Sequence, residues 1–180
     1  MQTPSKILDN AVEQLSSLPG IGKRSALRLA LHLLKRNEHE IHDFANAIID
    51  LKLNVINCKE CGNISDQPVC DICLNPNRSN EIICVVEDIR DIIAVESTGA
   101  FKGKYHVLGG VISPMDGIGP NDLNIQPLLE KVNSKKVKEI IFALSPTMEG
   151  DTTNFYLYKK LKEYAPLITT LSRGVSVGAE

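Results

Sequence analysis

The chain has 180 residues, of which 43% are hydrophobic and 23% are charged. This balance is that of an ordinary globular protein, and it excludes a disordered or fibrous chain. No apolar run approaches the ~20 residues that a membrane-spanning helix needs, and the N-terminal sequence MQTPSKILDN lacks the apolar core of a signal peptide. We therefore expect a cytoplasmic protein, in which paired cysteines more often hold a metal ion than form disulfides.

The formal net charge is −2, but the charges are unevenly distributed. Residues 1–36 contain six basic side chains and two acidic ones, whereas residues 81–97 contain five acidic side chains and only Arg90 as a base. A basic end and an acidic segment indicate two different partners. Solvated helix faces would give the same pattern, so this alternative stays open.

The first 56 residues have the pattern of a small all-helical unit. Thr3 and Pro4 fit an N-cap followed by proline at the first helical position. Apolar residues recur at helical spacing over 7–15, 26–34 and 41–48, which predicts three helices.

The first two of these helices are separated by the turn SLPGIG, residues 17–22. Glycines here would allow unusual backbone conformations and the close approach of another backbone. The next helix begins near Lys23, and its free N–H groups could receive a phosphate. The stretch resembles a helix-hairpin-helix motif, which holds the nucleic-acid backbone without reading sequence. We expect Lys23, Arg24 and Arg28 to contact DNA. A glycine turn between two packed helices is the alternative, and the apolar faces could also serve in dimerisation.

Four of the five cysteines lie in CKECGNISDQPVCDIC, residues 58–73, as two C-x-x-C pairs. Such pairs supply four thiolates in tight turns, which suits a tetrahedral Zn²⁺ ion. A redox role needs one reactive pair and does not explain the doubled pattern. Four sulfur ligands leave no open position for water, so we predict one structural zinc per chain. The predicted ligands are Cys58, Cys61, Cys70 and Cys73.

After the linker-like segment LNPNRSN, strands alternate with helices. Short apolar runs predict strands at 81–86, 105–110, 138–144 and 167–171, and helical spacing predicts helices at 88–97, 125–132 and 152–164. This alternation predicts an α/β domain with a mostly parallel sheet. The segment VISPMDGIGPNDL, residues 111–123, is expected to be a long loop. Cys84 is expected to be a buried, inert thiol, and the four histidines to be surface or packing residues.

The order of helical unit, four-cysteine segment and α/β region resembles the bacterial RecR family over essentially the whole chain. The matching segments are LPGIGKRSALR, the two cysteine pairs, ICVVE, VESTGAFKGKYHVLGG, SPMDGIGP, PTMEG and RGVSVGAE. The resemblance implies a helix-hairpin-helix unit for DNA binding and dimerisation (1–56) and a four-cysteine zinc finger (57–79). It also implies a Toprim domain (80–166) and a Walker B-like C-terminal segment (167–180).

In catalytic Toprim proteins a glutamate ends the first strand and a D-x-D pair follows a later one, and these carboxylates hold Mg²⁺. Glu87 matches the glutamate, but Ser145 and Thr147 stand where the aspartates belong. The resemblance therefore implies an inherited fold without catalysis. No P-loop accompanies the Walker B-like segment, so we expect no ATP hydrolysis. The alternative is a Mg²⁺-dependent nuclease or primase that uses Glu87, Glu149 and Asp151.

For the acidic face, the resemblance implies a protein partner, RecO, and in some lineages RecF. An uncompensated acidic face would repel DNA phosphates and favour a protein. The candidate contacts are Glu87, Asp88, Asp91 and Glu149.

The family also implies a mechanism of binding and handover. Its members form a ring-shaped tetramer that can encircle DNA, and they act with RecO to load RecA onto single-stranded DNA coated by single-strand-binding protein. RecR chains continue past RGVSVGAE with a further strand and helix, which leaves ring closure open, so we expect a homo-oligomer that is a dimer or a tetramer. A pure assembly module, whose helices dimerise without touching DNA, is the second alternative.

Overall fold

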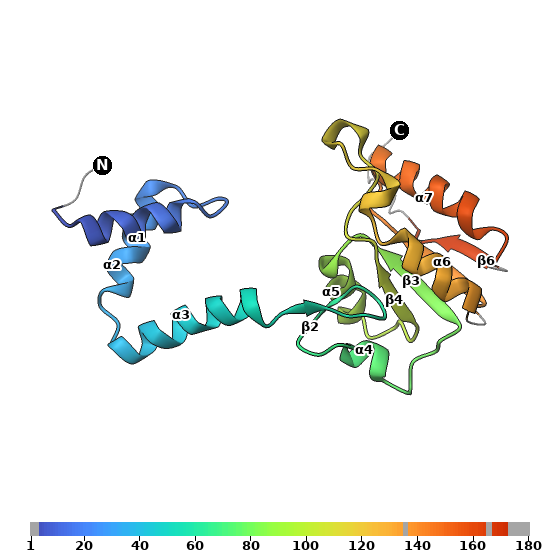
Figure 1. The fold of residues 1–180 in the computed structure, drawn as a ribbon, viewed down its shortest axis with the longest axis horizontal. Helices are drawn as coiled ribbons and strands as arrows, with labels where there is room; N and C mark the ends of the chain where they lie inside the picture. Colours follow the sequence, from blue (N-terminus) through green and yellow to red (C-terminus); the bar gives the residue numbers. More distant parts are fainter. Residues whose placement is uncertain (1–3, 135–136, 165–166, 173–180) are drawn as a thin grey trace, which may run out of the picture. The chain divides into compact units, whose positions relative to one another are not determined.

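Among the residues that the structure describes, helices build the first part of the chain and the two sheets lie in the second part (Figure 1). The computed structural model describes residues 4–134, 137–164 and 167–172. The chain divides into two units, Met1–Asn54 and Val55–Glu180. Among the described residues, no helix has both the length and the apolar character needed to cross a membrane.

The first unit consists of α1 (Lys6–Ser16), α2 (Lys23–Leu33) and α3 (Glu38–Leu53), as the periodicity predicts. Ser5 caps α1 by accepting a hydrogen bond from the Leu8 N–H at 3.3 Å. The predicted start of this helix is wrong, because Pro4 precedes the cap and Thr3 lies outside the described residues. A serine hydroxyl satisfies one of the free N–H groups of the first turn.

The second unit contains a parallel sheet in the order β4-β3-β5-β6. Its strands are β3 (Ile82–Val86), β4 (Lys104–Val107), β5 (Glu139–Ala143) and β6 (Leu167–Thr170). All four strands were predicted. The second is shorter than expected, because Gly109 and Gly110 after it have φ of 84° and 154° and turn the chain away.

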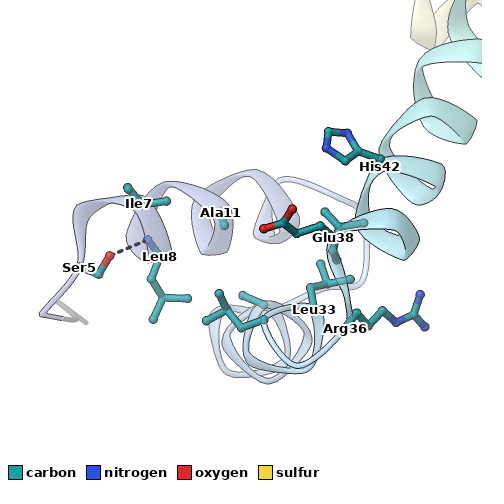
Figure 2. Close-up of a pocket in the computed structure, with 11 residues that line it drawn as sticks. Ser5, Ile7, Leu8, Ala11, Leu33, Arg36, Glu38 and His42 are labelled. Carbon is teal, nitrogen blue, oxygen red and sulfur yellow. Dashed lines mark hydrogen bonds between the residues drawn. The ribbon is translucent and has the colours of Figure 1, made fainter.

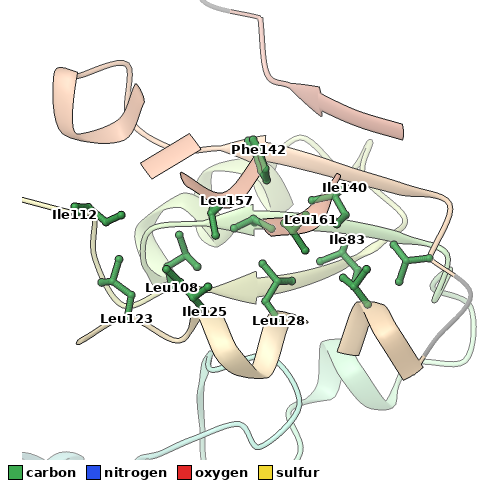
Figure 3. Close-up of a cluster of buried hydrophobic side chains, with 13 residues drawn as sticks. Ile83, Leu108, Ile112, Leu123, Ile125, Leu128, Ile140, Phe142, Leu157 and Leu161 are labelled. Atoms are coloured by element: carbon green, nitrogen blue, oxygen red, sulfur yellow. The ribbon is translucent and has the colours of Figure 1, made fainter. Parts of the chain in front are cut away.

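The helices α5 (Ile89–Ser97), α6 (Ile125–Ser134) and α7 (Met148–Leu161) cover this sheet. Successive strand residues point to opposite faces. On one face Ile83, Ile140 and Phe142 pack against α6 and α7, from which Leu128, Leu157 and Leu161 enter the core (Figure 3). On the other face Cys84 and Val86 pack with Ile92 of α5.

The helix α7 begins four residues before the predicted start at residue 152. Thr147 is its N-cap and accepts a hydrogen bond from the Gly150 N–H at 3.1 Å. The first turn lacks the apolar spacing of a buried helix face, because Met148 is 82% exposed and Glu149 and Asp151 are charged, so the sequence pattern does not reveal this start. The new start places Thr147 and Glu149 at the beginning of a helix, close to the end of β5.

Short elements occur where loops were expected. The cysteine segment contains a two-stranded antiparallel hairpin, β1 (Ile56–Asn57) and β2 (Ile64–Ser65), and one helical turn, α4 (Asp71–Leu74). The long loop contains two 3-10 turns, η1 (Pro114–Asp116) and η2 (Pro120–Asp122). It is joined to α7, because the Ile112 N–H donates to the Thr153 hydroxyl at 2.8 Å.

Candidate metal centre and functional surfaces

The four cysteines of the C-x-x-C pairs converge. Their Sγ atoms all lie within 4.8 Å of one another, and Cys58, Cys61 and Cys70 are at most 5% exposed. Among the described residues, no other group of three or more cysteine, histidine or carboxylate side chains comes together in this way. Four sulfur atoms at such separations fit one tetrahedral zinc ion.

Backbone N–H groups hold the ligand loops in place. The Gly62 N–H donates to the Cys58 carbonyl at 2.8 Å, and the Cys70 N–H donates to the Cys58 sulfur at 3.2 Å. Gly62 has φ of 76°, and a Cβ there would lie 3.0 Å from the Val107 carbonyl oxygen. Glycine therefore lets the first loop both turn and press against β4.

The cysteines differ in acidity. A hydrogen bond from the Cys61 thiol lowers the pKa of Cys73, whereas the same hydrogen bond raises the pKa of Cys61 and burial raises that of Cys70. Zinc binds deprotonated thiols, so binding of the ion would release the thiol protons of Cys61 and Cys70. In contrast, burial raises the pKa of Cys84 to about 12, and Cys84 is only 2% exposed. This fits the inert thiol expected at that position.

The cysteine segment is fastened to the edge strand of the sheet. The Val107 N–H donates to the Cys61 carbonyl at 2.7 Å, and the Lys104 ammonium donates to the Cys73 carbonyl at 2.6 Å. A metal held by these loops would therefore stabilise both the segment and its attachment to β4.

A carboxylate and a hydroxyl meet at the carboxyl end of the sheet. Glu87 directly follows β3, and the Ser145 hydroxyl donates to its Oε2 at 3.0 Å. Thr147 is occupied as the cap of α7. A Cβ on Gly150 would lie 2.0 Å from the Ser145 carbonyl oxygen, so α7 can begin here only with glycine at this position. In the described part of the chain, the ligand atoms of Glu87, Glu149 and Asp151 do not converge into a metal-binding group.

The acidic residues predicted to bind a partner do not form one uncompensated surface. The Asp91 carboxylate accepts hydrogen bonds from the N–H groups of Glu87 and Asp88, at 3.0 and 3.2 Å, and thereby caps α5. The Arg90 guanidinium pairs with Asp88 and lowers the pKa of that carboxyl. The spacing of three residues between Asp88 and Asp91 signals a capping box, which sequence reasoning missed.

A further acid of this segment also has a basic partner. Arg78 lies in the stretch expected to be a linker, and it pairs with Glu96, donating from Nη1 at 3.0 Å. The Tyr105 hydroxyl donates to the same carboxylate at 2.6 Å. The segment after the fourth cysteine is therefore anchored to α5 and β4.

The predicted DNA-binding residues lie on the surface of α2. Lys23, Arg24 and Arg28 are exposed. Arg24 and Arg28 line a shallow hollow together with His32, which follows on the same side of α2, and with Lys35, which lies in the turn after the helix. We call Arg24, Arg28, His32 and Lys35 the basic stripe. Lys35 was not predicted, although the spacing of 24, 28 and 35 could have indicated it.

The glycines of the turn before α2 differ from each other. Gly20 has φ of 78°, which requires glycine, whereas Gly22 has φ of −79° and ψ of 161°, which any residue adopts. The expectation that both allow an unusual conformation is therefore wrong for Gly22. In the described part of the chain, a Cβ at either position would meet no atom within 4 Å. The turn thus leaves room for a ligand next to the first turn of α2.

An apolar groove of about 580 Å³ runs along the first unit (Figure 2). It is lined by side chains of all three helices, among them Ile7, Leu8, Leu33 and Ile41. Ile7 is 85% exposed and Leu34 is 70% exposed. Such a surface is typical of an interface between protein molecules.

Comparison with known proteins covers nearly the whole chain. Residues 8–52 match the model "RecR, helix-hairpin-helix", residues 55–75 match the model of the RecR zinc finger domain with four cysteines, and residues 81–172 match "Toprim domain". "Recombination protein RecR" of Flavobacterium psychrophilum is 54% identical over 180 residues, which are 100% of this chain and 87% of the relative. The protein of the same name from Flavobacterium johnsoniae is 56% identical with the same coverage. That of Parabacteroides distasonis is 55% identical over 177 residues, covering 98% of this chain and 85% of the relative.

The chain belongs to the RecR family. Its zinc-finger match spans the four converging cysteines, so the predicted zinc cofactor is confirmed. Its Toprim match spans the parallel sheet with Glu87 and Ser145, and the predicted fold class is confirmed as well. The division into four parts at 56, 79 and 166 stays a prediction. Of the predicted Walker B-like segment, 167–180, the part from position 173 onward lies outside the described residues.

Proposed function

We propose that this chain is a non-catalytic, DNA-binding scaffold of recombinational repair. It would hold the DNA backbone through Lys23, Arg24 and Arg28, and act with RecO, with RecF as a further candidate partner, to load RecA on single-stranded DNA. The observation that carries this proposal is the basic stripe on α2 beside the open turn at Gly20 and Gly22.

The DNA contact is supported by charge and by space. Exposed basic residues on one face of a helix attract phosphates irrespective of base sequence. The Gly22 N-cap has no side chain that accepts a hydrogen bond from the first N–H groups of α2. These groups are therefore open to a phosphate oxygen.

The absence of catalysis is supported by the hydrogen-bond partner of Glu87, the carboxylate at the end of β3. In place of an aspartate, Ser145 donates a hydrogen bond to Glu87, and Thr147 caps a helix. One carboxylate with two hydroxyls is a poor ligand set for Mg²⁺, which needs several oxygen ligands in near-octahedral geometry. Mg²⁺-dependent strand cleavage that is abolished by Glu87→Gln would contradict this part of the proposal.

The acidic residues at the carboxyl end of the sheet would contact the protein partner RecO. Glu87 and Glu149 are the stronger candidates, because Asp88 and Asp91 have local roles in capping α5. Capping carboxylates still carry a charge, so all four would contribute to the attraction of a basic partner surface.

The apolar groove supports self-association into a dimer or a tetramer. A scaffold that acts on chromosomal DNA would be cytoplasmic and associated with the nucleoid.

The DNA contact is tested by the double variant Lys23→Glu, Arg24→Glu. We expect its affinity for duplex DNA to fall at least tenfold, and the slope of log affinity against log salt to decrease by about 2, because two phosphate contacts are lost. Fluorescence anisotropy with a labelled duplex measures both. Lys52→Glu, at an exposed lysine near the end of α3, is the control for net charge. Unchanged affinity of the double variant would favour a pure assembly module.

A further inference from the structure

Aromatic residues are scarce in this chain and gather at one place. The sequence has four phenylalanines, four tyrosines and no tryptophan, and half of these aromatic residues lie between positions 155 and 164. The same ten positions contain three lysines and one acid, Glu163. This segment is the second half of α7 and the turn that follows it.

Two of the aromatic rings of α7, those of Phe155 and Tyr158, are on the outer side of the helix, whereas Tyr156 packs against the core. Thr153, Leu157 and Leu161 are fully buried and fix the inner side of α7, with both leucines in the core (Figure 3). Phe155 and Tyr158 are 61% and 50% exposed. Interior packing therefore does not explain why large apolar rings occur at these positions.

Lysines lie beside these rings. Positions 155, 158, 159 and 162 follow the i, i+3, i+4, i+7 spacing of one helical face. The Lys159 Nζ lies 4.4 Å from the centroid of the Phe155 ring. We call Phe155, Tyr158, Lys159 and Lys162 the α7 outer face. In the part of the chain that the structure describes, neither lysine of this face forms an ion pair.

We propose that the α7 outer face binds single-stranded DNA, with bases stacked on Phe155 and Tyr158 and phosphates held by Lys159 and Lys162. Flat aromatic rings interleaved with cations are the surface that single strands need, because each nucleotide presents one ring and one negative charge. Stacking accepts every base, so the contact would be independent of sequence. A duplex keeps its bases stacked inside and offers no ring to Phe155. This surface is distinct from the basic stripe on α2, and its proposal does not depend on that contact.

Charge favours this occupant over a protein. Aromatic residues are common in protein interfaces, but lysine is depleted there. Two copies of the chain that met through this face would bring their lysines together, and like charges would oppose the contact. Phosphates are the complementary charge. Two acids border this face: Glu163 follows the helix, and the exposed Asp151 lies one turn before Phe155.

The absence of tryptophan makes a direct test possible in the full-length chain. Phe155→Trp keeps an aromatic ring on the face and introduces a single fluorophore. We expect oligothymidylate to quench this fluorescence, because a base stacks on the indole. An abasic oligonucleotide of the same length, which has the charge without the bases, should not quench it. Met115→Trp, at a 94% exposed site in η1, is the control and should stay unquenched.

Affinity measurements test the same face without a fluorophore. Phe155→Ala should weaken binding of oligothymidylate roughly tenfold and leave duplex binding unchanged. The double variant Lys159→Glu, Lys162→Glu should lower the salt slope for the single strand by about 1.4. Because these side chains are exposed, both variants should keep the unfolding temperature of the wild type.

The proposals for α7 and for α2 can be disproved independently of each other. If Phe155→Trp is not quenched, or Phe155→Ala binds oligothymidylate like the wild type, the α7 proposal is overturned, whatever Lys23→Glu, Arg24→Glu does to duplex binding. If Phe155→Ala instead lowers the solution mass and spares DNA affinity, the face is an interface between copies of the chain, which also overturns it. Loss of single-strand affinity in the α7 variants with normal duplex binding would support the proposal, and would leave the test of α2 intact.

Discussion

At the residue scale, two side chains meet at the carboxyl end of the parallel sheet. Glu87 directly follows β3, and its carboxylate accepts a hydrogen bond from the Ser145 hydroxyl at 3.0 Å. A second carboxylate at that distance would repel the first and invite a cation to bridge them. The hydroxyl instead satisfies the carboxylate by donating to it. We therefore expect this hydroxyl–carboxylate hydrogen bond, in place of a pair of carboxylates, to leave the position without a catalytic metal.

His106 makes stability dependent on pH. It is 2% exposed, its Nε2 lies 2.7 Å from the Asn124 carbonyl, and burial lowers its pKa to about 4. In the unfolded chain the histidine side chain has an ordinary pKa near 6.5. Between this pH and about pH 4 it therefore binds a proton in the unfolded state but stays neutral in the folded state. Stability is thus complete above about pH 6.5 and falls as the pH drops toward 4. At pH 5 we expect the second unit to lose about 2 kcal/mol of unfolding free energy through this group.

Urea unfolding at pH 7 and pH 5 measures this loss. His106→Leu should remove about 2 kcal/mol of the pH-dependent change, whereas His39→Gln, at a side chain that is 86% exposed, should keep it. An identical pH dependence in the wild type and in His106→Leu would show that His106 does not titrate as described.

At the scale of elements, the start of α7 depends on one glycine. Alanine at Gly150 would place its Cβ 2.0 Å from the Ser145 carbonyl oxygen, and backbone atoms cannot move aside cheaply. We expect Gly150→Ala to destabilise the second unit by about 3 kcal/mol. Gly22→Ala is the matched control, because its Cβ meets no atom within 4 Å. Its effect should stay within about 1 kcal/mol, as for a poorer N-cap. Equal denaturation midpoints of the two variants would refute this account.

The zinc finger is an element that its metal holds together. Among the described hydrophobic side chains, the three buried cysteines pack with Val69, Ile72 and Cys73, which is too little apolar surface for an independent core. We expect one zinc per chain, and removal of the metal should destabilise the second unit by about 4 kcal/mol. Elemental analysis with thermal unfolding, before and after treatment with a chelator, measures both.

Two variants distinguish a cysteine that binds zinc, Cys61, from a buried cysteine that does not, Cys84. Cys61→Ser should lose the metal. Cys84→Ala should keep one zinc per chain, because Cys84 lies in the sheet and is not a ligand. Zinc retained at full stoichiometry in Cys61→Ser would exclude the four-cysteine site.

At the scale of the whole molecule, the first unit exposes more apolar surface than a monomer should. Ile7, Leu34 and Leu53 are 70% exposed or more, and Ile48 and Leu51 are more than half exposed. We expect light scattering to give a mass at least twice the 19.8 kDa of one chain at micromolar concentration.

Charge placed in the groove should disrupt this association. Ile7→Glu is expected to lower the solution mass without unfolding the chain, because the side chain packs on little else. Met115→Glu, at the 94% exposed residue of the second unit, should leave the mass unchanged. A wild-type mass of 19.8 kDa at all concentrations would contradict self-association.

The amino-acid sequence by itself determined the kinds of element, the zinc ligands as a set and the family. These depend on local signals: apolar residues repeat with the period of a helix or a strand, and C-x-x-C pairs position thiolates within single turns. The order of these signals along the chain is enough to recognise RecR.

Only the tertiary structure decided which side chains are free to act. Several neighbouring polar residues could cap the same helix, so only the structure shows that Ser5 caps α1 and Thr147 caps α7. It also shows that the Asp91 carboxylate accepts a hydrogen bond in the cap of α5. Ser145 meets Glu87 across 58 residues of sequence, a contact that no local pattern encodes. Likewise, only the buried position of Leu157 shows that the rings of Phe155 and Tyr158 lie on the solvent side of α7. Packing against the sheet, and not periodicity alone, selects the face of the helix that solvent reaches.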